Sequence, residues 1–79
     1  MAKSRQLVKN GLYRHFKGGL YEVLYLAYDS ADENRRLVVY QNWSDYRVWV
    51  RPFDEFMSEV DHIKYPDVKQ KYRFELVER

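Results

Sequence analysis

Arginine and aromatic side chains alternate in the stretch DYRVWVRP, residues 45–52. If this stretch is a strand, Arg47, Trp49 and Arg51 share one face and the two valines between them share the other, because neighbouring side chains point to opposite sides. An indole ring that lies in solvent between two guanidinium groups can stack on a base or help to bind an anion. If the indole ring faces the core instead, Trp49 belongs to the scaffold of the fold and not to a binding surface. The direction of Trp49 therefore decides whether this strand is a candidate binding site.

Burial free energies alone do not settle the direction of Trp49. Burying its ring contributes at most roughly 5 kcal/mol, and burying Val48 and Val50 instead contributes roughly 3–6 kcal/mol. An arginine turned inward costs several kcal/mol unless it is paired. At the end of a short strand, however, an arginine can lay its stem on the core and keep its charge in water. We therefore expect Trp49 to face the core, with the exposed arrangement as the alternative.

A second group of polar and aromatic residues is YRHFK, residues 13–17, in which Tyr13 and His15 share a face. The following strand can bring Tyr21 or Tyr25 beside His15. Such a pocket would use the histidine as a hydrogen-bond donor or proton carrier, since its ordinary pKa lies near neutrality. The simpler interpretation, which we favour, is a histidine that is hydrogen-bonded at the rim of a sheet.

Other kinds of chemistry have little support in the residue types and spacings. The chain has two histidines, His15 and His62, no cysteine and no H-x-x-x-H spacing, so we expect neither a metal nor a cofactor. The serines lie in predicted tails, loops or a helix, and none lies in a nucleophile elbow. The pair Gly18-Gly19 is explained by a hairpin turn, where only glycine adopts positive φ without steric cost.

Length and composition indicate one small cytoplasmic domain. A chain of 79 residues fits a single domain that buries about 60% of its unfolded surface. The absence of cysteine, of a secretory signal and of an apolar run of about 20 residues favours the cytoplasm and argues against a membrane. The net charge of +2 is too small to predict nucleic-acid binding by itself. An aromatic content of 18% suits either a small core or a ligand surface.

The apolar pattern predicts a mainly β fold. Strands are expected at residues 12–16, 20–28, 37–41, 46–51 and 72–77, with the polar stretch DSADENRR as a loop and Trp43 at an exposed corner. In LYEVLYLAY, residues 20–28, eight of nine residues are apolar or aromatic, which predicts a central strand covered on both faces.

The chain after the fourth strand changes to a helical spacing. Phe53, Phe56, Met57 and Val60 lie at positions i, i+3, i+4 and i+7, which predicts a short helix or 3₁₀ turn. Five antiparallel strands with short connections predict a small twisted, partly open barrel, SH3-like or similar. We expect a flexible basic segment at residues 1–10 and a single β domain at residues 11–79.

Four stretches together resemble a known family: GLYRHFKGGLYEVLYLA from residue 11, LVVYQ from 37, WVRPFDEF from 49 and YRFELV from 72. Their order and spacing are similar to those of the bacterial family catalogued as Domain of Unknown Function 1653. Two departures stand out. Tyr28 occupies a position where the family tends to have histidine, and the segment before the last strand, HIKYPDVKQK, is longer and lacks glycine. The resemblance implies a small stand-alone β-rich protein, and it implies no activity.

These observations lead to a prediction of a non-catalytic binding or adaptor module with an aromatic and basic surface. Its partner is expected to be a protein or peptide, with nucleic acid as a further candidate. Rings would serve as stacking platforms and arginines as anion clamps. The candidate ligand-binding residues are Arg14, His15, Tyr40, Trp43, Trp49 and Arg51.

Two other interpretations remain open at the level of sequence. One is a minimal enzyme or enzyme subunit with His15 as general acid or base. The other is a weak homodimer formed through a sheet edge, the protein being otherwise monomeric.

Overall fold

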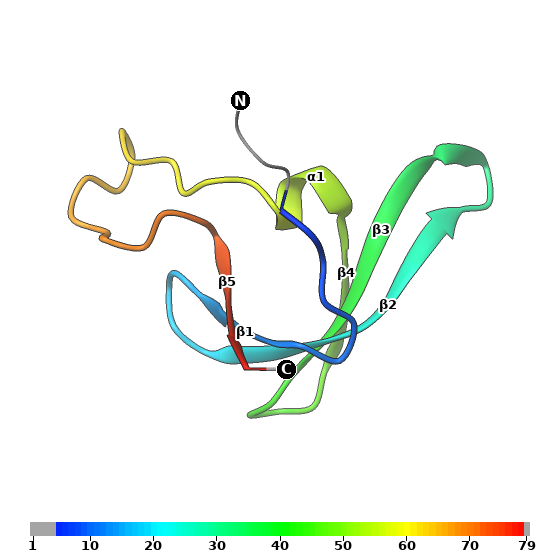
Figure 1. The fold of residues 1–79 in the computed structure, drawn as a ribbon, viewed down its shortest axis with the longest axis horizontal. Helices are drawn as coiled ribbons and strands as arrows, with labels where there is room; N and C mark the ends of the chain where they lie inside the picture. Colours follow the sequence, from blue (N-terminus) through cyan, green and yellow to red (C-terminus); the bar gives the residue numbers. More distant parts are fainter. Residues whose placement is uncertain (1–4, 79) are drawn as a thin grey trace.

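The computed structural model describes residues 5–78 as one antiparallel sheet of five strands with one short helix (Figure 1). The mainly β fold, the number of strands and the helix after the fourth strand are as predicted. The elements are β1 (Leu12–His15), β2 (Leu20–Asp29), β3 (Asp32–Asn42), β4 (Val48–Pro52), α1 (Phe53–Phe56) and β5 (Phe74–Glu78). No helix in this part of the chain is long and apolar enough to cross a membrane.

The sheet is curled but open. Its strand order is β4-β3-β2-β1-β5, which places β2 in the middle, as predicted, and leaves β4 and β5 as the two edges. Figure 1 shows these edges on opposite sides of a central space, with α1 at one end of that space. Since the edges do not pair with each other among the described residues, the curl is held by contacts outside the ladder. These are side-chain contacts and the backbone hydrogen bonds from Arg73 to Ser58 and from Val60 to Lys71.

The turn between β1 and β2 is the predicted glycine turn. Gly18 has φ 103° and Gly19 has φ 92°, a region that other residues rarely adopt. His15 closes the turn with two backbone hydrogen bonds, donating its N–H to the Gly19 carbonyl and accepting from the Gly18 N–H. This hairpin places His15 beside the first residues of β2.

The prediction of a loop at DSADENRR is wrong. Tyr28 pairs with Arg36 and Asp29 pairs with Asp32, so only a two-residue turn separates β2 from β3. The Asp29 carboxylate accepts the backbone N–H of Ala31 at 2.8 Å within this turn. In Figure 1 this end of the hairpin extends away from the rest of the sheet. Its polar sequence therefore reflects a strand with both faces in solvent.

The prediction that β2 is covered on both faces is also wrong for its outer half. Val23 is fully buried, but Tyr25 and Tyr28 are 59% and 63% exposed. A β-bulge between Val23 and Tyr25 inserts one residue, Leu24, into β2. The extra residue reverses the alternation of faces beyond it, so Tyr25 turns to the outer side of the sheet.

The core is a cluster of aromatic rings on one side of the sheet. Phe56 of α1 stacks on Phe74 of β5 with ring centroids 4.1 Å apart and planes 9° from parallel. Tyr13 and Tyr40 meet Phe56 edge-on at 5.4 and 5.2 Å. Val38 completes the cluster from β3. The stack joins the helix that follows β4 to the first residue of β5, and so spans the two unpaired edges.

The segment before β1 contacts this core. The Arg5 guanidinium donates to the backbone carbonyls of Met57 and Phe74 at 2.9 and 2.6 Å and lies 3.8 Å from the centroid of the Tyr72 ring. Leu7 packs against the core cluster. Residues 1–4 of the predicted flexible segment lie outside the described residues, and the flexibility of the segment stays a prediction.

We expect Phe56→Ala to lower the free energy of unfolding by about 3–5 kcal/mol, because it removes both a buried ring and its stacking contact with Phe74. Chemical denaturation followed by circular dichroism measures this loss. Ile63→Ala is the control, since Ile63 is 96% exposed and its removal should change stability by less than about 0.5 kcal/mol. Equal effects of the two substitutions would contradict a core built on this stack.

Candidate functional site

The register of β4 settles the direction of Trp49. Trp49 lies opposite Tyr40 and Arg51 lies opposite Val38, and both partners belong to the buried cluster. Trp49 and Arg51 therefore point to the core side of the sheet, as predicted. Yet the indole is 45% exposed, because β4 is an edge strand and the ring reaches only the open rim of the core.

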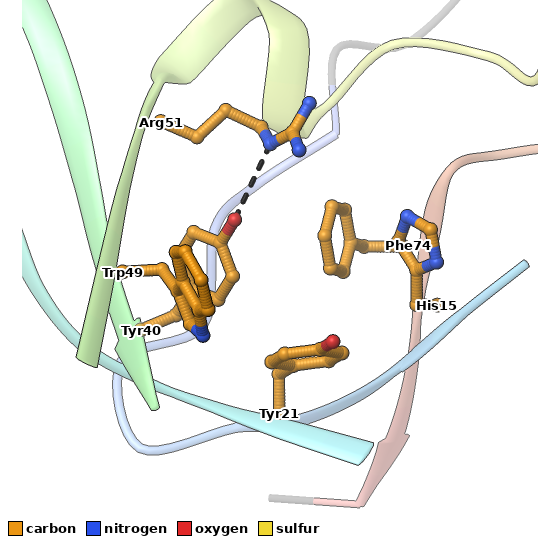
Figure 2. A pocket seen from close by; sticks show the side chains of 6 residues that line it. All are labelled: His15, Tyr21, Tyr40, Trp49, Arg51 and Phe74. Carbon is orange, nitrogen blue, oxygen red and sulfur yellow. Dashed lines mark hydrogen bonds between the residues drawn. The ribbon is translucent and has the colours of Figure 1, made fainter. Parts of the chain in front are cut away.

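A cavity of about 220 Å³ opens beside this rim. Figure 2 shows Tyr40 and Trp49 on one side of it, Phe74 and His15 on the other, Tyr21 below and Arg51 above. The rings of two tyrosines, a tryptophan and a phenylalanine, one imidazole and one guanidinium therefore surround one space. The lining, which we call the aromatic pocket, consists of His15, Tyr21, Tyr40, Trp49, Arg51 and Phe74.

Arg51 is fixed at the top of the aromatic pocket by two hydrogen bonds. Its Nε donates to the Tyr40 hydroxyl at 3.3 Å, and its Nη1 donates to the Glu55 carboxylate at 3.1 Å. The hydrogen bond with Tyr40 is the main reason that the pKa of Arg51 is raised. These bonds occupy Nε and one terminal nitrogen, which leaves Nη2 available to an anion.

His15 closes the opposite side of the aromatic pocket. Its ring lies edge-on to Phe74 and to Tyr21, with centroids 4.7 and 6.2 Å away. Its Nδ1 accepts the backbone N–H of Lys17 at 3.2 Å, which places the proton of the neutral ring on Nε2. The pKa of His15 is lowered from 6.5 to about 4 by burial and then by the positive charges of Arg51, Lys17 and Arg73. At neutral pH the ring is therefore uncharged.

A second hollow of about 310 Å³ shares His15 and Arg51 with the aromatic pocket. Its other walls come from the end of β1 and from the long connection between α1 and β5. We call its four cationic residues, Lys17, Arg51, Lys64 and Arg73, the basic bay. The remaining lining residues are His15, Phe16, Asp61 and Tyr65. Lys17 and Lys64 lie 5.2 and 5.5 Å from the Tyr65 ring centroid, and they lower the pKa of that tyrosine.

Four of the six candidate residues from the sequence meet at the aromatic pocket: His15, Tyr40, Trp49 and Arg51. The other two lie elsewhere. Arg14 pairs with Leu20 and Glu75 on the outer side of the sheet. Trp43 is exposed, as predicted, and its indole N–H donates to Glu22, also an outward position, at 3.4 Å.

The sequence analysis placed Tyr21 or Tyr25 beside His15, and the structure selects Tyr21, since the bulge turns Tyr25 away. Phe74 was missed as a pocket residue. Alternation in the last strand indicates only that it faces inward, and nothing local shows that it meets His15. The basic bay was also missed, because Lys64 lies in a segment that was interpreted as a solvated loop.

Residues 11–76 match the family described as Protein of unknown function (DUF1653). The chain belongs to this family. A search of the curated proteins and a search of the solved structures found no match. The fold and the two hollows are therefore described from this chain alone, and the SH3-like character of the fold stays a prediction. Among the described side chains of residues 5–77, no group of three or more histidine, cysteine, aspartate or glutamate residues could hold a metal ion.

The lowered pKa of His15 gives a testable pH dependence. Because the folded protein holds this proton less tightly than the unfolded chain, the contribution of His15 to stability is complete above pH about 6.5 and is lost as the pH falls towards about 4. We expect stability to fall with pH across this window and His15→Gln to remove part of the slope. Denaturant titrations at several pH values measure it. Ile63→Ala, which changes an exposed side chain without an ionisable group, should leave the slope unchanged, and equal slopes in all three proteins would contradict the prediction.

Proposed function

We propose that this protein is a binding module that holds its partner by a flat ring in the aromatic pocket, with a negative charge beside that ring held by Arg51. The observation that carries the proposal is the cavity of about 220 Å³ with four aromatic rings in its wall and a fixed guanidinium at its rim. The partner is a protein, a peptide or a nucleic acid that presents such a group, and we place the module in the cytoplasm.

The size of the aromatic pocket favours a single ring. Pockets that enclose a whole drug-sized molecule usually measure about 300–1,000 Å³, so about 220 Å³ suits a smaller group. Rings in protein contacts stack or meet edge-on, and both the exposed indole of Trp49 and the ring of Tyr21 offer such contacts. A stacked base or comparable ring is worth about 1–3 kcal/mol.

The charge around the pocket favours an anion over a cation. Aromatic cages that bind ammonium groups rely on the negative faces of their rings. Here the Arg51 guanidinium lies at the same opening and would repel a cation. Burial is the main cause of the lowered pKa of His15, and the neighbouring positive charges lower it further because they disfavour another one. A carboxylate or phosphate would instead gain charge-assisted hydrogen bonds from Arg51.

Binding is proposed in preference to catalysis with His15. A group with a pKa of about 4 is almost wholly deprotonated at pH 7 and serves poorly as a general acid. His15 fits the proposal instead as a neutral wall residue whose Nε2 can donate one hydrogen bond to a ligand.

The proposal is tested with two probes that carry the same ring and opposite charges, indole-3-acetate and tryptamine. Each is titrated into ¹⁵N-labelled protein, and the indole N–H signals of Trp49 and Trp43 are followed by NMR. We expect indole-3-acetate to shift the Trp49 signal and to bind about tenfold more tightly than tryptamine, since one charge-assisted hydrogen bond is worth about 1.5–3 kcal/mol.

Two pairs of variants locate the binding. Arg51→Gln should weaken binding of indole-3-acetate about tenfold, whereas Arg47→Gln removes the same charge from an exposed position next to Asp45 and should not. Trp49→Leu should weaken binding, and Trp43→Leu should not. Equal affinity for the two probes, or equal effects within each pair of variants, would overturn the proposal.

A further inference from the structure

We propose that the ring is a nucleobase and the charge a phosphate, so that the aromatic pocket and the basic bay together bind a nucleotide, either free or at the end of a nucleic-acid strand. This inference rests on the proposed function and adds the class of ligand. It is argued from the adjacency of the two hollows, from the charges of the bay, and from the position of the acidic residues.

The two hollows are adjacent and differ in chemistry. His15 and Arg51 line both, so the two spaces meet at these side chains. One space is walled mainly by rings and the other by cations. A nucleotide has the same division, since a single sugar joins a flat base to a doubly charged phosphate. A ring that carries only a carboxylate would use Arg51 and leave the rest of the bay empty.

The basic bay has unused capacity for an anion. Lys17, Lys64 and Arg73 form no ion pair within residues 5–78, and the Nε of Arg73 is buried without a hydrogen-bond partner. The one carboxylate in the lining, Asp61, already accepts the backbone N–H groups of Ile63 and Lys64 at 3.1 Å. A phosphate has several oxygens that accept hydrogen bonds and so can use several of these donors at once.

The small net charge of the chain hides this concentration of positive charge. Several acids lie at the far end of the β2–β3 hairpin, where Asp29, Asp32 and Glu33 surround the turn. Part of the acidic charge lies close to the bay, since Glu55 pairs with Arg51 and Asp61 belongs to the lining. Four cations still outnumber these two carboxylates, so a net charge of +2 for the chain is compatible with a positive site. The argument from net charge against nucleic acid therefore does not apply to the site itself.

The lining of the aromatic pocket predicts weak selection among bases. Stacking tolerates any base because each has a π-face. The aromatic pocket offers more apolar than polar surface, and the Tyr40 hydroxyl already accepts a hydrogen bond from Arg51. We expect adenine and uracil nucleotides to bind with similar affinity, within about tenfold of each other.

The decisive experiment compares adenosine, AMP and inorganic phosphate on the full chain by calorimetry and NMR. We expect AMP to bind at least about tenfold more tightly than either fragment, because only AMP occupies both hollows. AMP should shift the Trp49 indole signal together with the backbone signals of Lys17 and Lys64. Its affinity should fall as sodium chloride is added, while that of adenosine should not.

A matched pair of double variants tests the basic bay without touching the core. Lys17→Gln with Lys64→Gln should weaken AMP about tenfold or more and leave adenosine within about twofold. Lys9→Gln with Lys69→Gln removes the same total charge from exposed positions outside the bay and should leave AMP binding unchanged.

The outcomes separate this inference from the proposed function. If AMP binds no better than adenosine or phosphate, or if the two double variants behave alike, the nucleotide inference is overturned. If indole-3-acetate still shifts the indole signal of Trp49 in that case, the proposed function stands and only the nucleotide inference fails. If neither indole-3-acetate nor AMP shifts Trp49, both fail. A 5′-phosphorylated trinucleotide identifies the source: tighter binding than AMP indicates a strand end, and equal binding indicates a free nucleotide.

Discussion

The stack of Phe56 on Phe74 is the interaction on which the rest of this structure depends. β4 and β5 are edges of one open sheet and do not pair with each other in the part of the chain that the structure describes, so the curl depends on a connection within the core and on two backbone hydrogen bonds between the segments that follow α1 and precede β5. The stack supplies the connection within the core, because one ring follows β4 and the other begins β5. Phe74 also contacts His15, Tyr21 and Tyr40, so the ring that closes the core is at the same time a wall of the aromatic pocket. Stability and the shape of the site are therefore set by one cluster.

This shared wall explains how so short a chain presents a defined cavity. Aromatic side chains bury much surface with few rotatable bonds, which limits the entropy lost on ordering them. The Tyr40 hydroxyl accepts a hydrogen bond from Arg51, and Arg51 in turn binds Glu55, which lies four residues later in α1. The guanidinium is thereby oriented before any ligand arrives, and preorganisation of this kind lowers the cost of binding.

Much of this arrangement could be predicted from the sequence, and the failures have physical causes. The alternation of side chains correctly placed Trp49 and Arg51 on one face, because the direction of a side chain in a short regular strand follows from its position in the sequence alone. It failed at Tyr25, since a bulge depends on pairing with a distant strand. The stretch DSADENRR was misassigned as a loop because its polar composition indicates only exposure to solvent. A strand that protrudes from the sheet is exposed in the same way as a loop. The meeting of His15 with Phe74, far apart in sequence, depends on the pairing of β1 with β5, which makes them cross-strand partners, and it has no local signal.

The unequal lengths of the strands have a consequence for motion. Leu37–Gln41 of β3 pair with β4, and β1 pairs only with the first residues of β2, so the outer part of the β2–β3 hairpin is a ribbon of two strands. Such ribbons are marginally stable alone, and their amide protons exchange through local opening. The aromatic pocket lies at the other end of the hairpin, among strands paired on both sides or tied by the core. Fraying of the ribbon can thus proceed while the cavity keeps its shape.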